Sequence, residues 1–280
     1  MLQNFFPGVN RVKPGYIDAH LHLQDVRFST ITDLLIENAQ KAGVGLLLCN
    51  AVSESEWSAV TDLGKNNGSV IPFLGIHPWH AAQAVDGWEI RLADLLGTLD
   101  HFSGIGESGL DKTCGTDFTC QVKTLETHLD LAQQFSIPIV LHCVRSWGKM
   151  IDILESRARN NRLPVTMIHS FSGSYEMMKR FADLGCSISY SLKIMGPFGG
   201  KTADILSRTP VEQLLLETDA PARLNPLLFV NTKTITGYSE PVQIPAFYLW
   251  AARQKNVEPS LFMKQLWRNG QIYTNKKTGG

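Results

Sequence analysis

Residues 137–171, IPIVLHCVRSWGKMIDILESRARNNRLPVTMIHSF, contain two strand-like runs joined by a helical pattern. The runs at 137–143 and 164–171 are nearly continuous in apolar residues, which is typical of strands buried on both faces of a parallel sheet. Between them, residues 148–159 carry apolar side chains at three-to-four spacing, as an amphipathic helix does. Because a crossover helix joins parallel strands, this stretch predicts a strand–helix–strand unit of an α/β fold.

The same unit recurs along the whole chain. Eight strand-like runs lie at 16–20, 43–51, 70–78, 101–110, 137–143, 164–171, 186–192 and 212–221. Further helical patterns lie at 32–43, 125–135 and 175–185, and two more helices are expected at 241–255 and 259–270. Repetition at about 22 to 35 residues per unit predicts a (β/α)8 TIM barrel, with one domain over residues 1–280. The main alternative is an open doubly wound sheet, which does not require eight strands.

The composition is that of an ordinary globular protein, with 44% hydrophobic and 19% charged residues. Lys plus Arg and Asp plus Glu each number 26, and a neutral chain is not expected to wrap nucleic acid through positive charge alone. The five cysteines lack zinc-knuckle spacing, which predicts free thiols in a reduced compartment. The sequence has neither a signal-peptide pattern nor an apolar run of about 18 residues, so we expect a cytoplasmic protein without a membrane partner.

Residues that commonly bind metal ions fall at the ends of predicted strands. They are His20 and His22 in the first strand, His77 in the third, Glu107 in the fourth, His142 in the fifth, His169 in the sixth and Asp219 in the eighth. The carboxyl ends of barrel strands meet at one mouth, where the active sites of these enzymes lie. A single His-x-His pair is weak, since both rings could meet solvent at a strand end. Convergence from six strands predicts a metal site.

Six short motifs carry a likeness to a known family. They are DAHLH (18–22), GIHPW (75–79), GIGESGLD (104–111), IVLHC (139–143), IHSFSGS (168–174) and LLLETDAP (214–221). In order and spacing they closely resemble the motifs of the TatD family of metal-dependent deoxyribonucleases, within the amidohydrolase superfamily. The likeness extends over nearly the whole chain and implies a TIM barrel that holds two divalent metal ions.

The resemblance also implies a role for each residue of the set. One ion would be held by His20, His22 and Asp219, the other by His142 and His169, with Glu107 as the bridge between them. His77 is not a usual ligand in the family and matches a residue that faces the phosphate of the substrate.

The residue types support this assignment independently. A carboxylate can join two ions about 3.5–4 Å apart, the separation used by two-metal phosphoryl-transfer sites. Four imidazoles with two carboxylates favour Zn, Mn or Co, with Mg as an alternative where it is abundant. Glu107 and Asp219 are the expected catalytic residues: the ions lower the pKa of a water and neutralise phosphate charge, and Asp219 accepts the proton.

The rim offers weaker candidates for contact with the substrate. Arg145 lies three residues after His142, and Lys201 lies in GPFGGKT (196–202). That stretch is not a Walker phosphate loop, because Met195 occupies the place of the first glycine. Loops after strands seven and eight of barrels nevertheless often bind phosphate.

Two rim positions depart from the family pattern. Ala222 stands where the family commonly has tyrosine, and Ser239 stands where an asparagine usually precedes Glu-Pro. Trp79 and Trp147 are expected near the mouth, where they could either stack bases or pack against the rim. These features leave the proposed ligands unchanged and bear on the choice of substrate.

The leading functional hypothesis is a metal-dependent deoxyribonuclease that cleaves single-stranded or frayed DNA by a two-metal mechanism, with no obligate protein partner. A first alternative keeps the metal site and changes the substrate to an ester such as D-aminoacyl-tRNA, because the same site can attack a carbonyl. A second alternative is a catalytically silent metal-binding scaffold. The complete ligand set argues against that scaffold.

Overall fold

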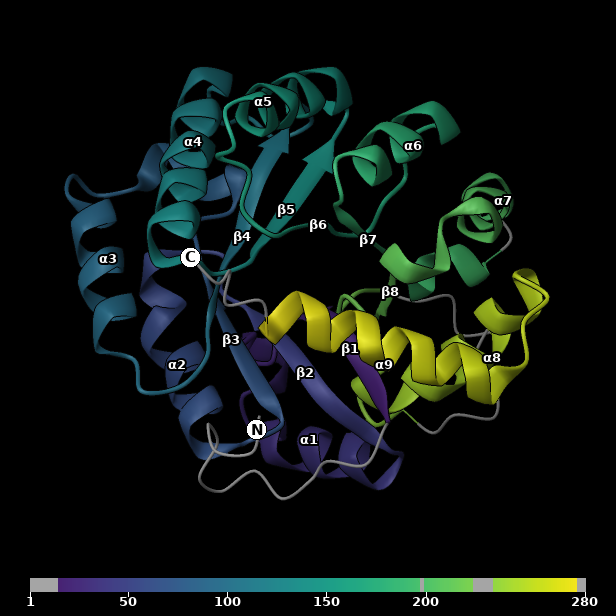
Figure 1. Cartoon of the computed structure of the whole chain (residues 1–280). Coiled ribbons are helices and arrows are strands. Elements are labelled where there is room, and N and C mark those ends of the chain that lie inside the picture. Colours follow the sequence, from purple (N-terminus) through teal and green to yellow (C-terminus); the bar gives the residue numbers. More distant parts are fainter. Residues whose placement is uncertain (1–14, 197–198, 224–233, 276–280) are drawn as a thin grey trace, which may run out of the picture.

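Eight parallel strands form a nearly closed barrel in the computed structural model, which describes residues 15–196, 199–223 and 234–275 (Figure 1). The strands are β1 (Tyr16–Leu21), β2 (Val44–Asn50), β3 (Val70–Leu74), β4 (Gly104–Asp111), β5 (Ile139–Val144), β6 (Thr166–Ile168), β7 (Ser187–Ser191) and β8 (Leu214–Glu217). They pair in chain order. A further parallel bridge between Leu21 and Ala220 brings the end of β8 back to β1. The predicted (β/α)8 barrel is therefore confirmed.

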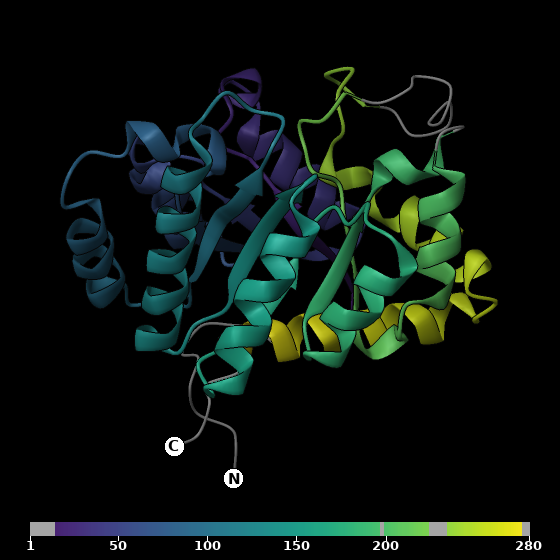
Figure 2. The same ribbon diagram turned by 90° about the horizontal axis from the view of Figure 1, so that it is seen from above.

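A helix follows each strand and packs on the outside of the sheet (Figure 2). These helices are α1 (Thr32–Lys41), α2 (Trp57–Asn66), α3 (Trp88–Thr98), α4 (Phe118–Phe135), α5 (Trp147–Arg159), α6 (Tyr175–Asp183), α7 (Gly200–Arg208) and α8 (Ile244–Gln254), and α9 (Pro259–Asn275) follows α8. Short 3-10 turns lie in the connections between strands and helices. They are η1 (Val26–Phe28), η2 (Glu54–Glu56), η3 (Pro78–Gln83), η4 (Leu192–Met195), η5 (Val211–Gln213) and η7 (Pro241–Gln243).

The two C-terminal helices differ slightly from the predicted ranges. The segment predicted as a helix from 241 begins as the 3-10 turn η7, where Glu240 and Gln243 form a reciprocal cap. Proline has no N–H to donate, which suits it to this first turn. The last helix, predicted for 259–270, continues to Asn275 because its final turns still have an apolar surface to cover.

The inside of the barrel is filled with apolar side chains at the end where the strands begin. This inner cluster contains Ile17, Ala19, Leu48, Phe73, Val140, Met167 and Leu215 from the strands, with Trp267 and Tyr273 from α9. Helix α9 lies across this end of the barrel in both views (Figures 1 and 2). The approach is close: a Cβ at Gly270 would lie 2.1 Å from Ile17 Cδ1. Helix α9 therefore closes the amino-terminal end, and only the opposite end remains for a site.

The cysteines are free thiols, as predicted. Cys49, Cys143 and Cys186 are buried, and burial raises the pKa of each to about 12, so they are packing residues and poor nucleophiles. Across the described ranges, none of the helices combines the length and the apolar character needed to cross a membrane.

Candidate metal centre

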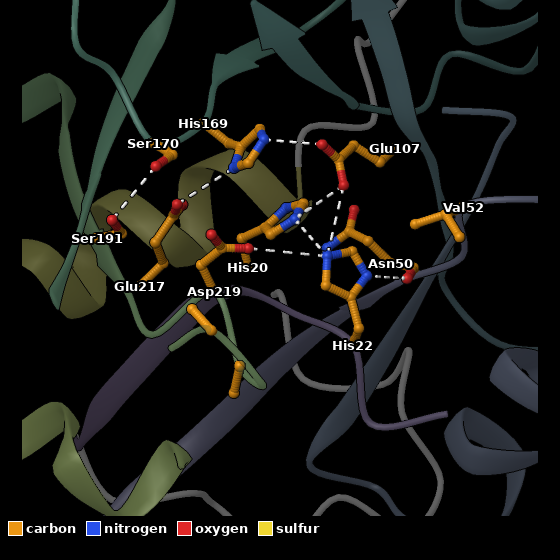
Figure 3. Close-up of polar contacts among 12 residues, drawn as sticks. His20, His22, Asn50, Val52, Glu107, His169, Ser170, Ser191, Glu217 and Asp219 are labelled. Atoms are coloured by element: carbon orange, nitrogen blue, oxygen red, sulfur yellow. Dashed lines mark hydrogen bonds and ion pairs between the residues drawn. The ribbon is translucent and has the colours of Figure 1, made fainter. Parts of the chain in front are cut away.

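The strand-end residues singled out in the sequence converge at the carboxyl-terminal mouth of the barrel. Figure 3 shows five of them, His20, His22, Glu107, His169 and Asp219. Glu107 lies within β4, His20 within β1 and His142 within β5, whereas His22, His77, His169 and Asp219 follow β1, β3, β6 and β8. The ends of β1 and β8 interlock, because the His22 N–H donates to the Ala220 carbonyl at 2.7 Å and the Asp219 N–H to the His20 carbonyl at 3.0 Å. These bonds hold the two strand ends side by side.

The Glu107 carboxylate is the centre of the cluster, and its two oxygens face different histidines. Oε2 lies 3.2 Å from His20 Nε2 and 3.5 Å from His22 Nε2. Oε1 lies 2.8 Å from His169 Nε2 and 2.9 Å from His142 Nδ1. The side chain is 3% exposed, so a single buried carboxylate touches two groups of imidazoles at once.

The nitrogens within each histidine group also point at one another. His20 Nε2 and His22 Nε2 are 3.2 Å apart, and so are His142 Nδ1 and His169 Nε2. Two nitrogens bound tetrahedrally to one zinc ion at about 2.0–2.1 Å would be separated by about 3.3 Å. The spacing of both pairs therefore fits a shared ion.

Hydrogen bonds behind the rings orient the histidines. His22 Nδ1 lies 2.8 Å from the Asn50 carbonyl, and His169 Nδ1 lies 3.2 Å from Glu217 Oε1 (Figure 3). A carbonyl or carboxylate on Nδ1 keeps the proton there and directs the Nε2 lone pair into the cluster, as in many metal-binding histidines. The Ser189 hydroxyl donates to the second oxygen of Glu217, which fixes that carboxylate in turn.

Glu217 and the Asn50 carbonyl were missed in the sequence analysis. Glu217 had a recognisable signal, because it lies two residues before Asp219 on a predicted strand and alternate residues share a face. The contribution of Asn50 comes from its main chain, so no residue type could reveal it.

Burial and charge set the protonation of the cluster. Burial lowers the pKa of His20 and lowers that of His77 to about 4, so both rings are neutral near pH 7. Burial raises the pKa of Glu107, but attraction to His169 and a hydrogen bond with His142 outweigh it, and the net pKa is well below the usual value. Burial lowers the pKa of His169, but Glu107 and Glu217 outweigh it and hold that pKa well above normal. The carboxylates thus stabilise positive charge, which a divalent ion would supply in place of a proton.

Asp219 completes the cluster on the side of His22. Its Oδ1 lies 3.8 Å from His22 Nε2, and its Oδ2 lies 2.6 Å from Lys193 Nζ on η4. Burial raises the pKa of Asp219, but Lys193 and the nearby histidines outweigh it and keep this carboxylate ionised. Its φ of 51° is in the left-handed region, which is uncommon for a residue other than glycine and is often found at functional sites.

His77 lies inside the cluster instead of at its edge. Its Nε2 is 3.3 Å from Glu107 Oε1, its ring packs against His142, and its Nδ1 accepts from the Trp79 N–H at 3.2 Å. The donor atoms of His77, Glu107 and His142 all lie within 4.8 Å of one another. His77 therefore has access to the same space as the predicted ligands, while its expected contact with phosphate stays a prediction.

The sequence as a whole decides the family. Residues 17–273 match the family described as TatD related DNase. The chain belongs to the TatD family. The resemblance seen in the motifs is therefore confirmed.

Several proteins of this family are similar to the chain in sequence or in structure. The chain is 32% identical over 213 residues to the "Uncharacterized metal-dependent hydrolase YjjV" of Escherichia coli, covering 74% of this chain and 79% of YjjV. The crystal structure of YjjV superposes with a TM-score of 0.83, covering 93% of this chain and 98% of that one at 28% identity. The "3'-5' ssDNA/RNA exonuclease TatD" of Yersinia pseudotuberculosis is 29% identical, covering 87% and 93%. This TatD-family chain is a metal-dependent hydrolase.

Two basic residues singled out in the TatD-like sequence are exposed at the rim. Arg145 directly follows β5 with an exposed side chain and a φ of 50°, and Lys201 is exposed in the first turn of α7. Among the described residues, neither forms a hydrogen bond or ion pair with the cluster. The basic side chain that does reach it is that of Lys193, two residues after β7. Its position just past a predicted strand was a signal in the sequence, but lysine is not a metal ligand and was therefore not singled out.

Two aspartates within the TatD motifs support the site in different ways. Asp18 accepts from the Thr218 N–H at 2.8 Å and from the Thr218 hydroxyl at 2.5 Å. It ties β1 to β8 next to Asp219. Asp111 accepts from the Trp79 indole at 2.8 Å and lies 3.5 Å from His142 Nε2, so it links the rim to the cluster.

Proposed function

We propose that this TatD-family hydrolase is a two-metal nuclease that cleaves single-stranded or frayed DNA from an end. The observation that carries the proposal is the division of the Glu107 carboxylate, whose Oε2 faces His20 and His22 while Oε1 faces His142 and His169. A carboxylate shared in this way is the arrangement expected for a bridge between two ions.

The ligand assignment follows from these contacts. His20, His22 and Asp219 would hold one ion, His142 and His169 the other, and Glu107 both. A donor set rich in imidazole nitrogen favours Zn or Mn, with Co or Mg as alternatives. Bound ions would lower the pKa of water and neutralise the charge that grows on the phosphate.

The protein side chains supply the remaining chemistry. Asp219 is ionised and borders the His22 group, so it is placed to accept a proton from the attacking water. Glu217 and the Asn50 carbonyl keep His169 and His22 oriented as the charge of the site changes. The apolar layer beneath the cluster excludes bulk water, which strengthens each of these interactions.

A nucleic-acid substrate is favoured by the relatives and by the rim. The Yersinia relative is named as an exonuclease of single-stranded DNA and RNA. At the mouth, Trp79 is 57% exposed although its indole N–H is fixed by Asp111, so it offers an open and rigid face on which a base could stack. Trp147 instead packs against Phe171 at a centroid distance of 4.9 Å, which fits rim packing.

The test is a substrate screen with metal-loaded protein. Labelled single strands, blunt duplexes, D-aminoacyl-tRNA and simple esters are assayed side by side, and bound metal is counted by elemental analysis. We expect about two bound metal ions per chain, preferential cleavage of single strands and complete inhibition by a chelator. Cleavage should depend only weakly on salt concentration, as expected when about one to three counterions are released from the nucleic acid on binding. His80→Ala is the control for variants of the histidine ligands, because this half-buried histidine pairs with Gln83 near the same mouth.

Other outcomes would replace the proposal. Release of D-amino acids from tRNA without cleavage of single strands would make the protein a deacylase that uses the same ligands. Two bound ions without turnover on any of these substrates would favour the silent scaffold.

A further inference from the structure

One strong contact at the mouth is not explained by the ligand set. Lys193 Nζ lies 2.6 Å from Asp219 Oδ2, so an ammonium group is bonded to the carboxylate expected to bind an ion and accept a proton. The Lys193 side chain is 51% exposed, whereas that of Asp219 is 17% exposed. The lysine therefore reaches the cluster from the solvent side, from which a substrate would enter.

The turn that carries Lys193 is firmly anchored. It belongs to η4, directly after β7, and its neighbours Leu192 and Ile194 are buried between the barrel and its helices. The main chain is thus fixed while the four-carbon side chain above it can pivot. A pivoting cation next to a fixed carboxylate can change partners without a change in the fold.

A bound ion would weaken the hold of Asp219 on Lys193. Asp219 would then share its charge with the ion, and two cations near one carboxylate repel each other. The substrate brings a new anion to the same mouth, since a phosphodiester carries negative charge on its non-bridging oxygens. The three N–H groups of the ammonium are suited to donate to such an oxygen.

We propose that Lys193 is a catalytic residue that moves from Asp219 to a non-bridging oxygen of the scissile phosphate when metal and substrate are bound. The proposal rests on the phosphodiesterase function proposed above. Lys193 keeps all its protons and contributes charge and hydrogen bonds only. As the water oxygen bonds to phosphorus, the P–O bond to the leaving oxygen breaks and that oxygen takes a proton from solvent. The water proton goes to Asp219, which is free to accept it once the ammonium has left.

This assignment gives Lys193 the role that the sequence suggested for Arg145 or Lys201. Within the described part of the chain, Lys193 is the lysine whose ammonium group contacts the cluster. If the lysine served only as a structural lock, it would hold Asp219 in its left-handed conformation and would have no effect on binding of phosphate. The two roles therefore make different predictions.

The experiment compares Lys193→Met, Lys193→Arg and the control Lys179→Met. Lys179 is an exposed lysine that also pairs with an aspartate, Asp183, at 3.1 Å, on the outer helix α6. Each metal-loaded protein is titrated with inorganic phosphate at equilibrium. It is then assayed on a single-stranded oligonucleotide, on bis(p-nitrophenyl) phosphate and on neutral p-nitrophenyl acetate. Metal affinity is measured separately by competition with a chelating dye.

The expected results have opposite signs in the two binding measurements. Lys193→Met should weaken phosphate binding about tenfold and slow phosphodiester turnover about 10- to 100-fold, since one charge-assisted contact is lost. It should bind metal about 3- to 30-fold more tightly, because a cation that competes for Asp219 is gone. Lys193→Arg should recover much of the phosphate binding. In Lys193→Met, turnover of the neutral ester should fall less than turnover of the phosphodiesters, because that substrate brings no anionic oxygen to the ammonium group. Lys179→Met should match the wild type.

Unchanged phosphate affinity in Lys193→Met, or weaker metal binding, would overturn the proposal and leave a structural lock. The phosphate and metal titrations do not depend on the identity of the substrate. If the wild type failed to cleave phosphodiesters, the nuclease proposal would fail, while these titrations would still decide whether Lys193 binds phosphate.

Discussion

The two ends of the barrel are built on the same eight strands and are opposite in character. At the amino-terminal end, Trp267 and Tyr273 of α9 pack onto Ile17 and its apolar neighbours, and the interior is sealed. At the carboxyl-terminal end, Glu107 is surrounded by histidines at 2.8–3.5 Å. One end buries hydrocarbon, and the other buries charge.

The contrast teaches where stability and function reside. Burying apolar surface stabilises the fold, whereas burying ionisable groups costs free energy unless partners compensate. At the mouth, the cost of burying ionisable groups is offset by contacts that a bound ion would strengthen, such as those between Glu107 and its histidines. Changes at the two ends should therefore separate: the mouth should govern activity and metal content, and the sealed end should govern the free energy of unfolding.

The largest effect is expected at the centre of the mouth. Glu107→Gln keeps the shape of the side chain and removes the charge that would bridge two ions, so activity should fall at least about a thousandfold, with loss of at least one ion. Kinetics and elemental analysis check this, and circular dichroism should show a folded protein. Near-normal activity with two bound ions would show that Glu107 is not a bridge.

At the sealed end, Trp267→Ala should leave a cavity beneath the barrel. Trp267 is 6% exposed, and such a truncation should lower the free energy of unfolding by about 3–5 kcal/mol. Metal content and turnover should stay near wild type where the variant is folded. Ile272→Ala on the same helix is the control, because that side chain is 44% exposed. If Trp267→Ala lost metal while its free energy of unfolding stayed unchanged, the assignment of stability to the sealed end and of metal binding to the mouth would be wrong.

Asp219→Asn tests the edge of the mouth. The change preserves shape and removes the proton acceptor, so turnover should fall about a hundredfold while most of the metal is retained. The measurement is turnover at saturating metal together with metal content per chain. If His22→Ala, His142→Ala and Asp219→Asn all lost metal equally, a single-ion site would fit better than two.

A buried histidine behind the mouth should behave as part of the core. His128 accepts from the Ile76 N–H at 3.2 Å, and burial lowers its pKa to about 3. The unfolded chain therefore binds the proton first as pH falls through about 6.5, and stability is lost in that direction. This histidine should account for about 2 kcal/mol of destabilisation between pH 8 and pH 5. In denaturant titrations, the free energy of unfolding of His128→Gln should fall less between pH 8 and pH 5 than that of the wild type, by that amount. An equal fall in the two proteins would contradict the assignment.

The smallest effect is expected at the outer rim. Trp79→Ala removes an exposed stacking face and should raise the KM for oligonucleotides about tenfold, with little change for a small phosphodiester. Trp79→Phe keeps a stacking face without the hydrogen bond to Asp111 and should fall between Ala and wild type. An equal rise in KM for both substrates would mean that Trp79 acts through Asp111 and the metal centre instead of through a base.

The contrast between the two ends was only partly visible in the sequence. Residue type and position at the end of a strand are local properties, so the sequence predicted the residues found around Glu107. It did not indicate Lys193, because lysine is not a metal ligand. The hydrogen bonds between Asp18 and Thr218, which lie 200 residues apart in the chain, cannot be read from spacing.

By itself, the sequence determined the barrel, the family and the histidines and acidic residues that converge on Glu107 at the mouth. Continuous apolar runs and apolar residues at three-to-four spacing indicate which segments are strands and which are helices. In a closed parallel barrel the carboxyl ends of all strands meet at one mouth, so the residues at those ends lie together. Only the tertiary structure decided which oxygen of Glu107 faces which histidines, that the Asn50 carbonyl and Glu217 orient two of the rings, and that Lys193 contacts Asp219. These are distances between segments far apart in the chain, and packing sets them to within an ångström after the elements have formed.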